Sequence, residues 1–130
     1  MTLDDVLRGD AVPGVHLLDD RVDPVEAAER VRERGWLLLH VDATRAVDKR
    51  SFLTAIAEGC GFPTWFGHNW DALADALRDL SWAPAAGYVV LIDHSERYRT
   101  HADWGLVTEI FDEVTGHWAQ DIVPFFVLLR

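Results

Sequence analysis

The chain has 130 residues, of which 49% are hydrophobic, and its 22 acidic and 12 basic side chains give a formal net charge of -10. This length and apolar content exclude disorder over most of the chain and allow a core without metal or disulfide support. The acidic excess excludes binding to nucleic acids by phosphate neutralisation and favours a basic partner. We expect one domain spanning residues 1–130.

The first third of the chain contains one predicted helix between two candidate strands. Residues 15–18 are compatible with a short strand. Asp23 and Pro24 are typical of a helix start and Gly35 of a helix end, so a helix is predicted over residues 24–35. The continuous apolar run over residues 36–42 predicts a strand that is covered on both faces.

Two helices are predicted in the middle of the chain. The first covers residues 49–58, with Asp48 as its N-cap and Gly59 or Gly61 as its stop. The second covers residues 69–80 and begins at Asn69, while Gly67 permits a sharp entry into it.

A strand over residues 87–93, a helix from 104 to about 117 and a strand over 122–129 complete the predicted elements. Pro124 places the start of the last strand at a sheet edge or at Phe125. In the helix, core spacing selects Leu106, Val107, Ile110, Phe111 and Val114. Strands that alternate with helices predict an α/β fold with a parallel sheet.

The helix over residues 69–80 separates apolar from charged side chains. At about 100° per residue, one side holds Trp70, Leu73, Ala76, Leu77 and Leu80, and the other holds Asp71, Asp75, Arg78 and Asp79. The helix dipole explains an acid in the first turn, at Asp71, but it does not reach Asp75 or Asp79. The charged side is therefore either a surface for a cationic partner or an ordinary solvated helix face.

Residues 63–75 read PTWFGHNWDALAD. This segment resembles the barstar family of intracellular inhibitors of secreted barnase-like ribonucleases, whose pattern is proline, any residue, two aromatics, Gly-x-Asn-x-Asp-Ala-Leu-x-Asp. The resemblance extends more weakly over residues 36–130 and leaves residues 1–35 as an N-terminal extension. It implies a two-layer fold in which helices pack a three-stranded parallel sheet of order 1-2-3, starting at Trp36. Whether residues 15–18 add a fourth strand is left open.

The resemblance also implies a function without catalysis or cofactor. The chain would block the active site of a cognate basic ribonuclease with its acidic helix face, Asp75 reaching deepest. Trp65 would pack against the enzyme, Glu113 would add an ionic contact, and Gly67 and Asn69 would shape and cap the approach. The implied contact residues are Trp65, Phe66, Gly67, His68, Asn69, Asp71, Ala74, Asp75 and Glu113.

Two positions depart from the family pattern. Ala74 and Leu80 stand where the family carries aromatics, and Trp82 is a candidate replacement for the second. Since aromatic anchors are often binding hot spots, the partner need not be the original enzyme. The alternatives are a non-inhibitory interaction module and an immunity protein for another basic toxin.

Cys60 is the single cysteine, which excludes an intramolecular disulfide, and we expect it to be a small buried hydrophobe. The first residues lack the basic start and apolar run of a secretory signal. The longest apolar run, residues 122–129, is far shorter than the roughly 20 residues that span a bilayer. These features favour a cytoplasmic location.

Six histidines raise the question of metal or acid–base chemistry. None has a two-ligand spacing such as HExxH, and the nearest cluster is Asp93 and His94 with His101 and Asp103. His68 and Asp71 could share a surface as an acid–base pair, but lining a partner-binding turn is the favoured role of His68. We expect His40 in or beside a buried strand, where a neighbouring group satisfies it. A small hydrolase is therefore the least favoured function, and we expect no metal or cofactor.

Overall fold

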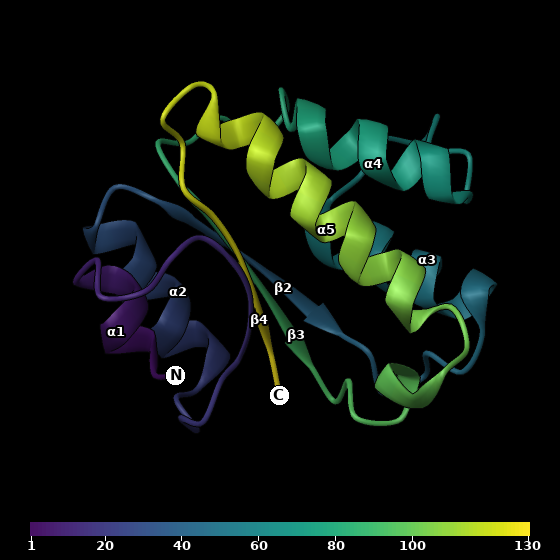
Figure 1. Cartoon of the computed structure of the whole chain (residues 1–130), viewed down its shortest axis with the longest axis horizontal. Coiled ribbons are helices and arrows are strands. Elements are labelled where there is room, and N and C mark those ends of the chain that lie inside the picture. Colours follow the sequence, from purple (N-terminus) through teal and green to yellow (C-terminus); the bar gives the residue numbers. More distant parts are fainter.

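All 130 residues are described by the computed structural model, in which four parallel strands form one sheet (Figure 1). The strands are β1 (Gly14–Leu17), β2 (Leu37–Asp42), β3 (Tyr88–Asp93) and β4 (Phe125–Leu129). The helices are α1 (Leu3–Leu7), α2 (Pro24–Glu33), α3 (Lys49–Cys60), α4 (Trp70–Asp79) and α5 (Trp104–Ala119), with a 3-10 turn at Tyr98–Thr100. The predicted α/β fold with a helix-packed parallel sheet is confirmed.

The strands lie in the spatial order β1-β4-β3-β2. The order β2, β3, β4 is the 1-2-3 order that the family resemblance implies. The segment that the sequence left open, residues 15–18, contributes most of β1, which pairs in parallel with β4 in a register that places Gly14 opposite Phe126. The sheet therefore has a fourth strand, supplied by the N-terminal extension.

Helices cover both faces of the sheet, α3, α4 and α5 on one side and α1 and α2 on the other (Figure 1). Every residue of β3 and β4 is buried, as expected for parallel strands between two helical layers. Alternate side chains divide between the layers, so that Val90 and Val127 join the core under α3–α5, whereas Leu91 and Leu128 pack with α1 and α2. Residues 1–35 thus bury a sheet face that residues 36–130 alone would leave exposed.

Side-chain caps begin three of the helices at the predicted residues. In each case a carboxylate or amide oxygen accepts a hydrogen bond from a free backbone N–H of the first turn. The pairs are Asp23 with Val25 at 2.8 Å, Asp48 with Ser51 at 2.9 Å and Asn69 with Ala72 at 2.7 Å. Local chemistry therefore determines where α2, α3 and α4 start.

The end of α3 differs from the predicted residue 58. Gly61 is the left-handed cap, with a φ of 64°, so the helix continues to Cys60. Gly59 lies inside the helix, where an added Cβ would come within 2.4 Å of the His40 carbonyl oxygen. This glycine allows α3 to approach β2 closely and does not stop the helix.

One further expectation needs correction. Leu106 was expected in the core but is 41% exposed, because the buried stripe of α5 runs through Val107, Ile110, Phe111 and Val114 and leaves it at the rim. β4 begins at Phe125, one of the two starts that Pro124 allowed, and Ile122 before it adopts a left-handed φ of 57°. The short helix α1, held by a capping box between Thr2 and Asp5, was not predicted.

Candidate partner-binding surface

The turn over residues 63–69 presents one aromatic side chain and buries another. The Phe66 N–H donates to the Pro63 carbonyl at 3.0 Å. Phe66 is 6% exposed and packs against Phe62, with ring centroids 4.9 Å apart. Trp65 is left 63% exposed beside it. Of the two adjacent aromatics in the motif, only Trp65 has its side chain at the surface of the unbound protein.

The sharp entry into α4 occurs one residue later than expected. His68, rather than Gly67, has the left-handed backbone, with a φ of 49°. Gly67 contributes space, because an added Cβ there would lie 3.2 Å from the Asn69 amide nitrogen. The His68 ring packs on Phe66 with centroids 4.9 Å apart, so it lines the turn.

The predicted separation of apolar and charged side chains on opposite sides of α4 is confirmed. Leu73, Ala76 and Leu77 are at most 1% exposed, whereas Asp71, Asp75 and Asp79 are exposed. Ala74 is also buried, at 7%, so its side chain does not reach the surface. The carboxylates of α4 therefore stand on a helix whose other side is fixed in the core.

Arg78 joins two of the predicted contact acids. Its Nη2 donates to Asp75 Oδ1 at 2.5 Å, and its Nη1 donates to Glu113 Oε1 on α5. The Asp75 and Glu113 side chains remain 66% and 59% exposed. We call Asp71, Asp75 and Glu113 the acidic surface. These acids were predicted from the sequence, but Arg78 was given no role. Its i, i+3 spacing from Asp75 is nevertheless typical of an ion pair on a helix.

The α4–α5 pair is held together independently of that ion pair. The two helices lie side by side over the sheet (Figure 1), and the Trp118 indole N–H donates to the Leu77 carbonyl at 2.9 Å. Leu77 and Val114 are buried between the helices and the sheet. The backbone that carries the acidic surface is thus rigidly supported.

Trp82 lies next to the exposed Trp65. The two rings meet edge to face with centroids 6.3 Å apart, and the Trp82 Nε1–H donates to the Cys60 carbonyl at 3.3 Å. Leu80, where the family pattern has an aromatic, is 1% exposed and caps α4 with a φ of 45°. An aromatic surface therefore does adjoin α4, and it is built from Trp65 and Trp82.

Two of the histidines considered for chemistry, His40 and His101, have structural partners. His40 Nε2 lies 2.7 Å from Asp93 Oδ2, which confirms that a neighbouring group satisfies it. The Asp103 N–H donates to His101 Nδ1 at 3.0 Å. No group of three or more His, Cys, Asp or Glu side chains is arranged to hold a metal ion.

Asp93 is the centre of a buried polar cluster at the carboxyl end of β3. It is 8% exposed and accepts hydrogen bonds from His40 and from the Arg130 guanidinium. Burial alone would raise the pKa of Asp93, but the hydrogen bonds and charges of Arg130 and His40 outweigh it and leave the pKa below its usual value. Cys60 is 2% exposed, which confirms the predicted buried side chain, and this burial raises the pKa of its thiol to about 12.

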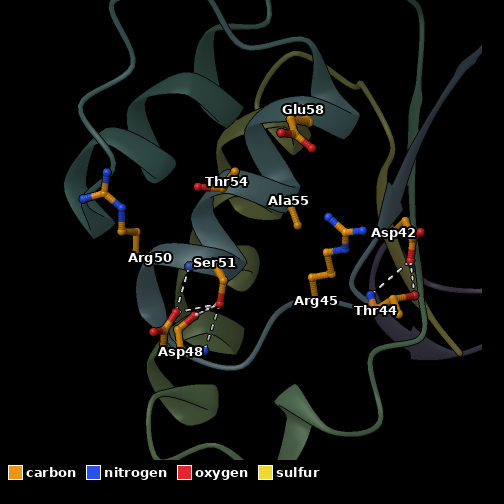
Figure 2. Close-up of a pocket in the computed structure, with 9 residues that line it drawn as sticks. All are labelled: Asp42, Thr44, Arg45, Asp48, Arg50, Ser51, Thr54, Ala55 and Glu58. Atoms are coloured by element: carbon orange, nitrogen blue, oxygen red, sulfur yellow. Dashed lines mark hydrogen bonds between the residues drawn. The ribbon is translucent and has the colours of Figure 1, made fainter.

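A groove of about 820 Å³ lies along α3 and the end of β2 (Figure 2). Two pairs of its polar residues are hydrogen-bonded. Asp48 and Ser51 cap α3, and Asp42 accepts from the Thr44 hydroxyl at 2.5 Å and from its N–H at 3.0 Å. Figure 2 shows Arg45 between these two pairs. The groove is lined by residues of α3 and of the turn after β2, and its two hydroxyl–carboxylate pairs cap the helix and close that turn.

The fold and these side chains define an acidic α/β protein whose exposed carboxylates and aromatics meet on α4, α5 and the turn before α4. Residues 36–130 match the family model for barstar, described as barnase inhibitor, and the chain belongs to this family. A comparison with curated proteins finds no match. No helix of the structure combines the length and the apolar character needed to cross a membrane.

Proposed function

We propose that this protein inhibits a basic, secreted ribonuclease by covering the enzyme's active site with the acidic surface. The observation that carries the proposal is the position of Asp75 and Glu113, which come from different helices and share one guanidinium. Membership of a family of barnase inhibitors supports it. The protein would act by binding, without catalysis of its own.

The mechanism is mimicry of RNA phosphates. A ribonuclease cleft presents cationic side chains to the phosphates of its substrate, and carboxylates on a rigid helix can take those positions with charge-assisted hydrogen bonds. The net charge of -10 would also speed the encounter with a basic enzyme. Asp71 at the start of α4 and Asp75 one turn later would enter the cleft, with Trp65 packing at its rim.

Fewer residues are proposed to touch the enzyme than the family resemblance implies. Trp65, His68, Asp71, Asp75 and Glu113 are exposed and would touch the enzyme directly. Phe66 and Ala74 are buried and would support the surface from below, and Asn69 is occupied as the cap of α4. Gly67 would keep the turn close to that cap.

We also propose where in the cell the protein acts. An inhibitor of a secreted ribonuclease protects the producing cell when it meets the enzyme before export, so we propose that the protein acts in the cytoplasm as an immunity protein. Fractionation of the producing cells tests this point, and recovery of the protein only from the medium would contradict it.

An inhibition assay tests the function. The purified chain is titrated into barnase, and into several related basic secreted ribonucleases, while RNA cleavage is followed. We expect at least one enzyme to be inhibited completely near one equivalent. A chain that is folded by circular dichroism but leaves every enzyme active, even in large excess, would contradict the proposal.

One observation favours a second candidate, a partner other than a ribonuclease. Ala74 and Leu80 are buried, so the aromatics that the family pattern carries at these positions have no counterpart there. A different basic toxin could match the Trp65–Trp82 surface instead. Binding of a basic protein with no effect on RNA cleavage would support this candidate.

A further inference from the structure

We propose that Arg78 is a specificity-determining residue of the acidic surface. It favours ribonucleases that present a carboxylate to the junction between α4 and α5, and it disfavours enzymes whose contact surface is uniformly basic. This inference rests on the proposed inhibitor function and names the kind of enzyme that the surface accepts.

The position of Arg78 is the first argument. The guanidinium lies between Asp75 on α4 and Glu113 on α5 and donates to both carboxylates. Its side chain is still 31% exposed. An enzyme that contacts both acids therefore also meets the positive charge between them.

The charge of the two helices is the second argument. Together α4 and α5 carry six carboxylates and a single guanidinium, with no lysine. The carboxylates are Asp71, Asp75, Asp79, Glu109, Asp112 and Glu113. A surface that served only to attract positive charge would gain nothing from a cation between two of its contact acids, since like charges brought together in an interface oppose binding.

The unused donors of Arg78 are the third argument. Nη1 and Nη2 each donate one hydrogen to the neighbouring acids, and a guanidinium has five N–H groups in a fixed fork. The remaining donors are suited to a carboxylate or a carbonyl from outside the chain. A partner with such an acceptor would complete the cluster, whereas a partner with lysine or arginine there would be repelled.

A purely structural role explains Arg78 less well. Its two ion pairs are largely solvent-exposed, and pairs of this kind contribute little to stability. The contact between α4 and α5 is maintained by buried apolar side chains and by the hydrogen bond from Trp118 to Leu77. We therefore expect Arg78→Ala to fold normally, which makes the inference testable.

The first experiment measures binding to barnase as a basic probe. Arg78→Ala is compared with Arg21→Ala, a control that removes the same charge from an exposed position between β1 and α2. We expect Arg78→Ala to lower Kd by about tenfold and Arg21→Ala to change it by less than about twofold. Equal effects of the two variants, or weaker binding of Arg78→Ala, would overturn the repulsive part of the inference.

The second experiment looks for the favoured acceptor. A library of barnase variants, each with one surface residue of the active-site region changed to Asp or Glu, is selected separately with the wild-type chain and with Arg78→Ala. We expect the wild-type chain to enrich at least one acidic variant about tenfold more than Arg78→Ala does. If the two chains enrich the same barnase variants to the same extent, the proposed role of Arg78 in specificity is wrong.

The outcomes separate this inference from the proposed function. If both chains bind barnase or its variants but select alike, the inhibitor function holds and only the role of Arg78 is wrong. If neither chain, shown to be folded, binds any enzyme in the inhibition panel or the library, the inhibitor function itself is wrong and the inference falls with it.

Discussion

Trp65 and Trp82 meet edge to face, with ring planes at 83° and centroids 6.3 Å apart. Trp82 is anchored behind the surface by its hydrogen bond to the Cys60 carbonyl and by an edge contact with Phe62. Trp65 projects from the turn and is 63% exposed. A large exposed aromatic held in place by a second one is the kind of group that anchors protein interfaces.

The first prediction concerns this aromatic pair. We expect Trp65→Ala to weaken binding to the inhibited ribonuclease by about 2 kcal/mol or more and to change the free energy of unfolding by less than about 1 kcal/mol, because the side chain is mostly exposed. Titration calorimetry and urea denaturation measure the two effects. The control is Ile122→Ala, which truncates an apolar side chain that is 89% exposed in a loop. Equal and small losses of affinity for both variants would remove Trp65 from the interface.

The second prediction compares two acids of α4. Asp75 belongs to the acidic surface and pairs with Arg78, whereas the exposed Asp79 accepts only from the Ser81 hydroxyl at 3.1 Å. We expect Asp75→Ala to cost about 2–5 kcal/mol of binding and Asp79→Ala at most about 1 kcal/mol. Both should leave the unfolding midpoint nearly unchanged. Inhibition constants and thermal unfolding of the two variants measure these effects. Equal small losses of affinity would show that the surface is generally acidic and that Asp75 makes no specific contact with the enzyme.

Sequence patterns were sufficient for the elements that local chemistry determines. Asp23, Asp48 and Asn69 were recognised as caps because capping depends on residues only two or three positions apart. The helix α1 was not predicted, because its five residues are too few to show a periodic hydrophobic pattern. Leu106 was misplaced because its spacing fits both the core stripe and the rim of α5.

The candidate partner-binding surface was likewise predictable only in part. Asp71, Asp75 and Trp65 were named from a contiguous motif and Glu113 from the family resemblance, whereas the link from Arg78 to Glu113 depends on how α4 packs beside α5. The contact of Trp65 with Trp82 depends likewise on the path of the chain after α4. Such tertiary contacts have no fixed sequence spacing, so no local pattern could have predicted them.

The third prediction concerns the N-terminal extension. Val31 and Val25 lie on the same helix, α2, but Val31 is fully buried against the sheet and Val25 is 79% exposed. We expect Val31→Ala to lower the free energy of unfolding by about 2 kcal/mol and Val25→Ala to have almost no effect. Neither variant should alter affinity, since α2 covers the sheet face opposite α4 (Figure 1).

Chemical denaturation of the two variants also tests the domain organisation. If residues 1–130 form one domain, fluorescence and circular dichroism should report a single coincident transition that shifts as a whole in Val31→Ala. A separate early transition in that variant, with the rest of the chain unaffected, would show instead that residues 1–35 fold as an independent unit.

The fourth prediction uses the lowered pKa of Asp93. A carboxyl whose pKa is lower in the folded chain than its usual value of 3.8 stabilises the fold fully above that value and loses its contribution as the pH falls through the lower, folded value. Asp93→Asn keeps the shape but cannot ionise, and it leaves the Arg130 guanidinium without its carboxylate partner. We therefore expect this variant to be less stable than the wild-type chain at pH 7, with the difference shrinking as the pH falls below about 4. Urea denaturation of both chains from pH 7 to pH 2.5 measures the difference, and parallel stability profiles over that range would show that Asp93 does not hold the carboxyl end of the sheet together by its charge.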